Sequence, residues 1–489
     1  MRPATLLFSA LFAVFLACSN TAPETVAAEP RVDPLIARID SFMQRNQRSG
    51  FAGSLLVMRD GEAVIDKGFG LRDREKGLPN MPSTVHAIGS ITKQFTAASV
   101  LKLQEQGKLD VKDPMSKYIA NVPADKASIT LHHLLTHSAG FPGAIGDDNE
   151  PIDGGDFTQL AMRTPLEFPP GSGYAYSNVG YSLLGIIVEI VSGMGYERYL
   201  HDALLAPAGL KHTGYRIPDW SKVELAIGYR KDGTRWGTML DHPLVNGGPG
   251  WHLRANGGLL STTHDMYDWV QALATNKVLS KPSTDQMFAP QVLEGEGAES
   301  HYGFGWALFK TQRDTRLITH NGGNGIQFAD VLWYADEGLT VVLMSNANKR
   351  GMQDMAWHVG RMCFDPSFEP PVPQDAKMLD GPPAGSVGER MKALSSIIGS
   401  PVDDVKLTAW LKDNLGPGFF EDFPLERHLT VFKQLHQDIG PNTIEFVQQL
   451  NAEEYEVKLR SQRDQGLFRV VLQLRPGDAR IAGLGVEKE

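Results

Sequence analysis

Residues 89–107 read GSITKQFTAASVLKLQEQG, and this stretch decides how the rest of the chain is interpreted. Strong helix formers with apolar residues at helical spacing predict an α-helix here, and Gly107 can end it. In that helix Ser90 lies at the N-terminus, where free N–H groups favour negative charge, and Lys93 lies nearby at i+3. A serine hydroxyl becomes a good nucleophile only when a neighbouring group accepts its proton. We therefore interpret Ser90 as a nucleophile and Lys93 as its base.

Lys93 needs partners for this role, because an unperturbed lysine has a pKa of about 10.4 and is charged at neutral pH. Desolvation or a neighbouring positive charge has to lower that pKa. Two later motifs, YSN beginning at Tyr176 and HNGG beginning at His320, offer such partners. Tyr176 can relay a proton, and Asn178 can orient Lys93 and a substrate amide. His320 can bias Tyr176 toward phenolate or, when protonated, contact a substrate carboxylate.

Each of these signals also has an ordinary structural explanation. Ser90 alone is a typical helix N-cap, the YSN motif a turn, and the HNGG motif a loop that leaves a strand. Because all three occur in order and with suitable local context, we favour one catalytic site built from them.

With these motifs the sequence resembles the serine β-lactamase and penicillin-binding protein superfamily, within it the branch of class C β-lactamases, D,D-carboxypeptidases and related esterases. The stretches that carry the resemblance are Gly61, Gly70 and residues 89–93, 107–114, 131–140, 170–171, 176–181, 257–262 and 320–346. The resemblance implies an α/β (α+β) fold, in which helices flank a β-lactamase-like antiparallel sheet and form a large helical subdomain.

The resemblance also implies roles for individual residues. The expected site residues are Ser90, Lys93 and Tyr176 for catalysis, with Asn178, His320, Gly322 and Gly323 for substrate binding. Ser90 would be acylated, Lys93 and Tyr176 would move its proton, and Asn178 would tie the site together. His320 stands where many members of the family carry lysine. The backbone N–H groups of Ser90 and Gly323 would form the oxyanion hole.

The expected function is a secreted serine hydrolase that acts on an ester, peptide or β-lactam carbonyl through an acyl-enzyme on Ser90. Asn321 departs from the family pattern, because β-lactamases and transpeptidases usually carry there a Thr or Ser that helps to bind the β-lactam carboxylate. The motifs do not separate β-lactamase, D,D-peptidase and esterase, since pocket shape decides substrate choice. The alternative is a penicillin-binding or sensor protein of the same fold that does not turn over a substrate. A third hypothesis is a purely structural protein of the envelope.

Other chemistries find little support. His133 and His137 could share a helix face and bind zinc, but no further ligand is marked by spacing, so we expect packing roles and no metal or cofactor. A Gly-x-Ser-x-Gly elbow and a complete phosphate-binding loop are both missing from the sequence. The net charge of −10 and the isoelectric point of about 5.8 disfavour nucleic acid. We expect a small-molecule or peptidoglycan-like substrate, and the sequence does not indicate an oligomeric state.

The N-terminus predicts export. Arg2 precedes an apolar run over residues 6–17, which is too short to span a bilayer. Residues 15–18 resemble a bacterial lipobox, so we favour a lipoprotein of the periplasm or outer membrane, anchored through a lipidated Cys18. Cleavage after Ala28 is the alternative. Cys363 is the second of two cysteines, which leaves no disulfide framework in the mature protein.

The chain divides into four parts by composition. We expect an export segment (1–28), a catalytic domain (29–365), a Pro-rich linker (366–386) and a small C-terminal α+β domain (387–489). Apolar patterns predict a hairpin that turns at Asp60 and Gly61, a buried helix over 181–192, and strands over 302–309, 317–319, 327–334 and 339–345. In the last part they predict helices over 402–414 and 425–438 and strands over 443–449, 455–461, 467–473 and 479–486.

Overall fold

The computed structural model describes residues 33–230, 233–295, 297–347, 351–371, 377–401, 403–422, 424–450, 453–475 and 477–488. The predicted export segment, with Cys18 and the cleavage site after Ala28, lies outside the described residues. No single helix in the described part is long and apolar enough to cross a membrane. One pair of helical segments, Asn178–Ser192 and Tyr196–Ala208, meets the length and composition test together but is bent by 76°.

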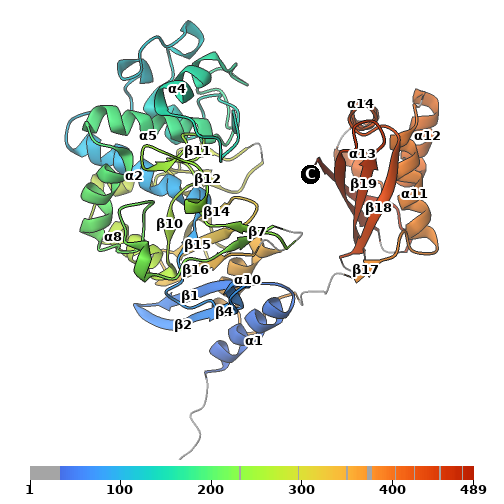
Figure 1. Cartoon of the computed structure of the whole chain (residues 1–489), viewed down its shortest axis with the longest axis horizontal. Coiled ribbons are helices and arrows are strands. Elements are labelled where there is room, and N and C mark those ends of the chain that lie inside the picture. The colour runs from blue at the N-terminus through green and yellow to red at the C-terminus, as the bar shows by residue number, and fades with distance from the viewer. Residues whose placement is uncertain are drawn as a thin grey trace, which may run out of the picture.

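A large antiparallel sheet forms the centre of the catalytic domain (Figure 1). Its strands, in spatial order, are β11 (Val292–Leu293), β12 (His301–Tyr302), β13 (Ala307–Lys310), β14 (Arg316–Gly323), β15 (Phe328–Tyr334), β16 (Leu339–Ser345), β1 (Gly53–Arg59) and β2 (Glu62–Phe69). β1 and β2 form the predicted hairpin, and positive φ angles at Asp60 and Gly61 make its turn. β1 also pairs with β16, so the first and the last strand of this sheet along the sequence are neighbours.

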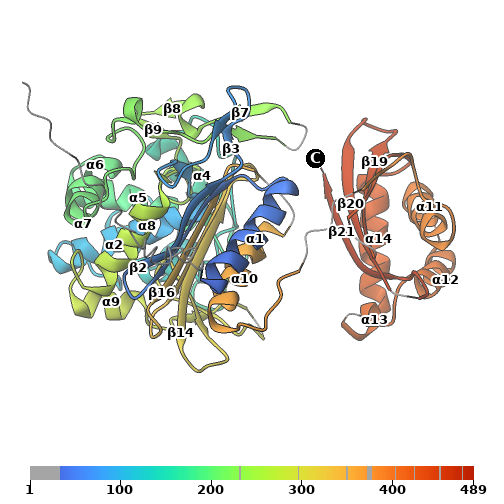
Figure 2. The same ribbon diagram turned by 90° about the horizontal axis from the view of Figure 1, so that it is seen from below.

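Helices cover both faces of this sheet, as Figure 2 shows. α1 (Pro34–Arg48) and α10 (Met352–Phe364) share a hydrophobic cluster with one face. The other face carries α2 (Thr92–Glu105), α8 (Thr263–Ala274) and the helical subdomain. That subdomain includes α3 (Leu131–Leu135), α4 (Gly154–Arg163), α5 (Asn178–Ser192), α6 (Tyr196–Leu200), α7 (Ala206–Ala208) and α9 (Lys281–Met287). The β-lactamase-like sheet with flanking helices predicted from the sequence is confirmed.

Short elements connect these layers. Four two-stranded pairs are β3 (Leu71–Asp73) with β4 (Leu78–Pro79), β5 (His86–Ala87) with β10 (Leu260–Ser261), β6 (Gly228–Tyr229) with β7 (Arg235–Gly237), and β8 (Leu244–Val245) with β9 (Gly248–Pro249). Single helical turns are η1 (Gly89–Ile91), η2 (Met115–Lys117), η3 (Ala124–Lys126), η4 (His201–Leu205), η5 (Trp220–Lys222) and η6 (Met239–Asp241). Of these, η1 holds the predicted nucleophile.

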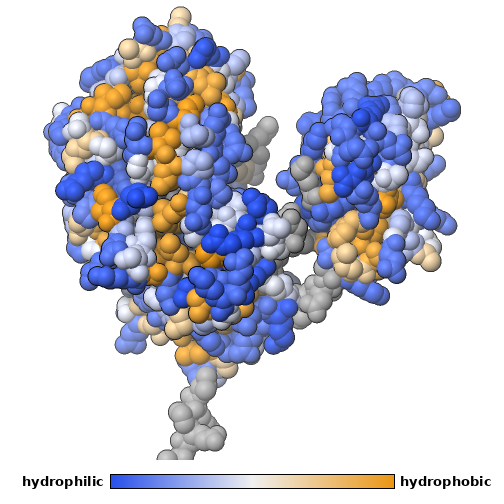
Figure 3. All heavy atoms as spheres, in the orientation of Figure 1, coloured by the Kyte–Doolittle hydropathy of each residue, from blue (hydrophilic) through white to orange (hydrophobic). Residues whose placement is uncertain are grey.

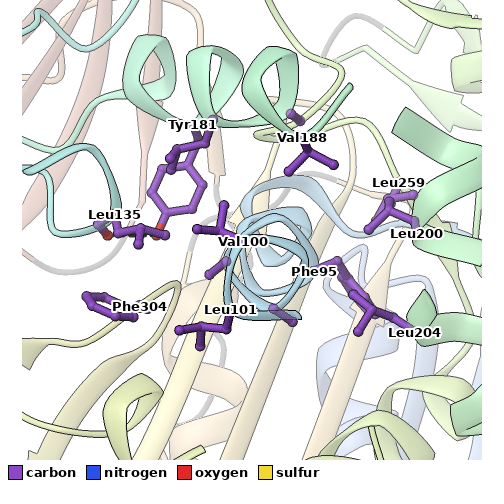
Figure 4. Close-up of a cluster of buried hydrophobic side chains, with 14 of the residues drawn as sticks. Phe95, Val100, Leu101, Leu135, Tyr181, Val188, Leu200, Leu204, Leu259 and Phe304 are labelled. Atoms are coloured by element: carbon purple, nitrogen blue, oxygen red, sulfur yellow. Dashed lines mark hydrogen bonds between the residues drawn. The ribbon is translucent and has the colours of Figure 1, made fainter. Parts of the chain in front are cut away.

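α2 is the central helix of the main hydrophobic core. Its residues are buried on nearly every side, including Phe95, Val100 and Leu101, which are inaccessible to solvent. Figure 4 shows α2 end-on among apolar side chains from α5, the chain near Leu200 and Leu204, and the loop with Phe304. Each such buried side chain contributes about 1.5–3 kcal/mol relative to an exposed one. This packing fixes α2, and therefore Lys93, on several sides.

The C-terminal domain has its own sheet and core. The strands are β17 (Lys377–Leu379), β18 (Asn442–Gln449), β19 (Glu454–Ser461), β20 (Leu467–Leu474) and β21 (Ile481–Lys488), and the helices are α11 (Ser386–Gly399), α12 (Asp404–Asn414), α13 (Gly418–Asp422) and α14 (Leu425–Asp438). β17 pairs with β18. β17 lies within the segment that was predicted as a linker (366–386). The helix α11 was not predicted. Figure 3 shows the surface of the whole chain from one side, where hydrophilic residues predominate around smaller hydrophobic areas.

Candidate active site

Ser90 and Lys93 meet at the start of α2. Ser90 lies in the single turn η1, immediately before the first residue of the α-helix. Its side chain is half-buried, whereas Lys93 is completely buried. The Nζ atom of Lys93 lies 3.0 Å from Ser90 Oγ, 2.7 Å from Asn178 Oδ1 and 2.9 Å from the carbonyl oxygen of Asn256. These distances place the amine within hydrogen-bond reach of the serine hydroxyl.

The surroundings of Lys93 favour its neutral form. Burial lowers the pKa of Lys93 well below 10.5, and the carboxylate of Asp148 raises it only in part. The side-chain oxygen of Asn178 and the carbonyl of Asn256 are acceptors only, whereas the Ser90 hydroxyl can donate. A neutral amine has two N–H donors and one lone pair, so it can donate to both acceptors and still accept the proton of Ser90. That is the arrangement a general base requires.

Tyr176 and Asn178 flank the N-terminus of α5. Between them, Ser177 caps this helix, because its Oγ accepts from the N–H of Gly180 and donates to the carbonyl of Pro142 at 2.7 Å. Lys93 Nζ lies 4.7 Å from the centre of the Tyr176 ring. The Tyr176 hydroxyl is buried without a hydrogen-bond partner inside the 3.5 Å limit among the described residues. Burial raises the pKa of Tyr176, and the neighbouring Ser90 side chain lowers it in part.

The end of β14 closes the site from the sheet side. There Gly322 and Gly323 approach η1 so closely that neither Gly322 nor Gly89 has room for a side chain. A Cβ atom on Gly322 would collide with the backbone nitrogen of Ser90, and one on Gly89 would collide with that of Gly323. The N–H groups of Ser90 and Gly323 therefore lie at one junction. The N–H of Ser90 belongs to the first turn of a helix, where no intrahelical acceptor exists.

His320 is neutral in this site, which corrects one sequence-based role. Its Nδ1–H donates to the carbonyl of Asn321 at 2.6 Å, and its Nε2 lies 3.0 Å from the hydroxyl of Tyr302, which can donate to it. Burial lowers the pKa of His320 to about 3. The ring is 6.1 Å from that of Tyr176, centre to centre. His320 therefore cannot supply a cation for a substrate carboxylate near neutral pH.

All seven sequence-predicted site residues thus come together around one junction of α2, α5 and β14. Comparisons with known proteins identify the family. The Beta-lactamase family model matches residues 35–361. The chain belongs to the beta-lactamase family. The superfamily predicted from the motifs, that of serine β-lactamases and penicillin-binding proteins, is confirmed.

This beta-lactamase family chain has relatives among penicillin-binding proteins. It is 34% identical over 257 residues to the Bacillus subtilis protein named "Putative penicillin-binding protein PbpX", an alignment that covers 53% of the chain and 62% of the relative. A penicillin-binding protein structure from Bacillus halodurans shares 25% identity at a TM-score of 0.56, over 66% of this chain and 98% of that one. An octameric homologue from Pyrococcus abyssi shares 22% identity at a TM-score of 0.61, over 93% and 98%. An alignment over 93% of this chain necessarily includes part of the C-terminal domain.

Several site residues of this beta-lactamase family protein were not found from its sequence. Asn256 contacts Lys93 through its backbone carbonyl, which no residue type reveals. Tyr302 was placed only in a strand, and its contact with His320 depends on the pairing of edge strands. His137 was assigned to packing, yet its ring lies 4.2 Å from the Tyr176 ring, centre to centre.

The histidines near α3 do not form a metal site. His133 helps to cap the helix, since its Nδ1 accepts from the N–H of Thr130. His137 lies beyond the end of α3 with a positive φ angle, so the two histidines do not share a helix face. In the described part of the chain, no three His, Cys, Asp or Glu side chains gather as metal ligands.

Proposed function

We propose that this protein is a serine hydrolase that cleaves an ester, peptide or β-lactam carbonyl through an acyl-enzyme on Ser90. The observation that carries the proposal is the buried amine of Lys93, 3.0 Å from Ser90 Oγ and held by two acceptor oxygens. A structural lysine gains little from such burial, because desolvation penalises its charge. A base that must be neutral benefits from it.

The steps follow from the atoms present. Ser90 Oγ attacks the carbonyl carbon while its proton passes to Lys93, directly or through the hydroxyl of Tyr176. The negative charge that develops on the carbonyl oxygen is stabilised by the N–H groups of Ser90 and Gly323. The proton then goes to the leaving group, the acyl-enzyme forms, and a water molecule activated by the same base pair releases the acid. Asn178 keeps Lys93 in place throughout.

The proposal also includes the type of substrate. Family relatives are named as penicillin-binding proteins, which supports acylation by peptide-like or β-lactam carbonyls. The neutral His320 and the Asn321 side chain favour substrates without a carboxylate beside the reacting bond. We therefore place esters and uncharged amides ahead of penicillins. A protein that is acylated once and does not turn over remains the competing function.

A fluorophosphonate probe tests the nucleophile. Intact mass of the purified protein should show one adduct, which Ser90→Ala abolishes. Ser99→Ala is the matched control, because Ser99 lies on the same helix and bonds only to the carbonyl of Phe95. Retention of the adduct in Ser90→Ala would refute the assignment.

Turnover of a panel of esters then distinguishes a hydrolase from a protein that is acylated once. Repeated release of product by the wild-type protein supports a hydrolase. A single stoichiometric release that leaves a stable acyl-enzyme supports the protein that does not turn over.

A further inference from the structure

His137 holds an unusual backbone conformation next to the site. It follows α3 and has a φ of +58°, in the left-handed region that non-glycine residues rarely occupy. Only 1% of the residue is exposed. Asn and Gly tolerate this conformation more readily than most residues. A histidine at this position is therefore held by its contacts, and those contacts point to Tyr176.

Two hydrogen bonds connect His137 to the residues on either side of Tyr176. The carbonyl oxygen of His137 accepts from the N–H of Ala175 at 3.0 Å. Its Nδ1 atom accepts from the N–H of Ser177, also at 3.0 Å. The backbone on both sides of Tyr176 is therefore bound to a single residue. Because Nδ1 is an acceptor here, the proton of the neutral ring is on Nε2.

The imidazole ring also contacts the Tyr176 ring directly. The two ring centres are 4.2 Å apart with an interplanar angle of 36°. Tyr302 and Tyr181 enclose His137 further, at 4.6 Å and 5.1 Å. Nε2 is buried and has no hydrogen-bond partner among the described residues. Burial keeps the pKa of His137 well below 6.5. The ring thus stays neutral and is unsuited to acid–base work of its own.

We propose that His137 is the positioning residue for Tyr176: it fixes the backbone on both sides of the tyrosine and the plane of its ring, so that the hydroxyl faces Ser90. This inference rests on the proposed function, in which Tyr176 relays the proton of Ser90. It predicts that His137 acts only through Tyr176. Displacing a catalytic group by about 1 Å can cost a factor of about 100 in rate.

A double-mutant cycle tests this directly. The variants are His137→Asn, Tyr176→Phe and the combination, assayed on an ester that the wild-type protein turns over. Asn tolerates positive φ, and its side-chain oxygen can still accept from Ser177, but it has no ring. His137→Phe keeps a ring and lacks the acceptor, so it separates the two contacts and replaces the Asn variant if that variant fails to fold. His133→Asn is the matched control, because His133 lies in the same segment and caps α3.

We expect His137→Asn to lower kcat by about 10-fold or more with KM changed less than about twofold. In the Tyr176→Phe background, the same change should lower kcat by less than about twofold, because the group it positions is already gone. His133→Asn should leave kcat within about twofold of wild type. Thermal melting shows which variants are folded.

Equal losses in both backgrounds would overturn the inference, since they would show that His137 acts independently of Tyr176. Unchanged kcat in folded His137→Asn and His137→Phe would overturn it as well. If Tyr176→Phe itself leaves kcat unchanged, then Tyr176 is not the proton relay, and the inference about His137 is refuted with that role. Failure of the hydrolase proposal is distinguishable, because it would be seen as loss of the Ser90 adduct or of turnover in the wild-type protein.

Discussion

Gly322 of β14 lies directly against the backbone nitrogen of Ser90, and a Cβ atom at position 322 would collide with it. The same contact brings the N–H of Gly323 to the N–H of the nucleophile. Two segments more than two hundred residues apart in the chain therefore share one junction at the reacting atoms. In the proposed mechanism, the spacing of that junction would decide where the carbonyl oxygen of a substrate is bound.

Gly322→Ala should therefore separate β14 from η1. The added methyl group meets rigid backbone atoms of Ile88 and Ser90, so it cannot be accommodated by a side-chain rotation. We expect acylation by a fluorophosphonate to slow by about 100-fold or more, because the oxyanion donors lose their geometry. Gly195→Ala is the control, since a Cβ at that exposed position meets nothing within 4 Å. Equal labelling rates for Gly322→Ala and wild type would contradict the oxyanion assignment.

The pH dependence of acylation should follow Lys93. Its pKa is lowered by burial, and only the neutral amine can accept the proton of Ser90. The rate constant for acylation should fall as pH decreases through this lowered pKa and should reach a plateau above it. A profile of kcat/KM against pH on a neutral ester measures this limb, and a rate that rises as pH decreases would argue against Lys93 as base.

Lys93→Arg should remove most of that activity, because it replaces a neutral amine by a permanent cation. Arginine is not deprotonated in proteins, so the variant has a cation where a base is needed. We expect kcat/KM to fall by a factor of about 100 to 10,000. Lys102→Arg is the matched control on the same helix, where the lysine bonds to Glu105 and to the carbonyl of Val278. Substantial turnover by Lys93→Arg would show that another group takes the proton.

Penicillin should be a poorer substrate than a neutral ester of similar size. The ring of His320 is neutral and bonded at both nitrogens, and Asn321 stands where the family usually has a hydroxyl residue. Asn321→Thr should raise kcat/KM for benzylpenicillin, relative to that for the ester, by about 10-fold, which corresponds to one hydrogen bond to a charged group. Stopped-flow acylation with both substrates measures the ratio. A ratio that already favours penicillin in the wild type would contradict this view of His320 and Asn321.

Much of the fold could be predicted because its signals are local. The turn at Asp60 and Gly61 and the apolar pattern of α5 each predict one element without reference to the rest of the chain. β17 was missed because its partner strand is not local. β17 is a three-residue strand in a Pro-rich context, and it pairs with β18, far along the sequence. Length and composition cannot reveal such a partner.

The site residues also differ in whether local sequence could predict them. Ser90 and Lys93 could be placed together because a helix brings i and i+3 side chains onto one face. The neutral state of His320 depends on its burial and on Tyr302, which lies on another strand. Asn256 uses a backbone carbonyl, and His137 combines a rare backbone angle with contacts to a distant helix terminus. These properties arise from tertiary packing, and residue identity alone does not contain them.

The C-terminal domain should unfold independently of the catalytic domain. Its hydrophobic cluster consists only of residues between Leu379 and Val486, and the clusters of the catalytic domain end at Phe368. Leu472→Ala, at a completely buried position, should destabilise this domain by about 2–5 kcal/mol. Val405→Ala is the control, because Val405 is 80% exposed and should shift stability by less than about 0.5 kcal/mol.

Calorimetry can distinguish independent unfolding of the C-terminal domain from cooperative unfolding of both domains. Two transitions are expected, and Leu472→Ala should lower only one of them, while the temperature at which fluorophosphonate labelling of Ser90 is lost stays the same. Independent transitions follow because no hydrophobic cluster in the described residues includes members of both domains. If Leu472→Ala instead moves a single transition together with the loss of Ser90 labelling, then the two domains unfold as one cooperative unit. In that case the C-terminal domain would stabilise the site through contacts other than a shared apolar core.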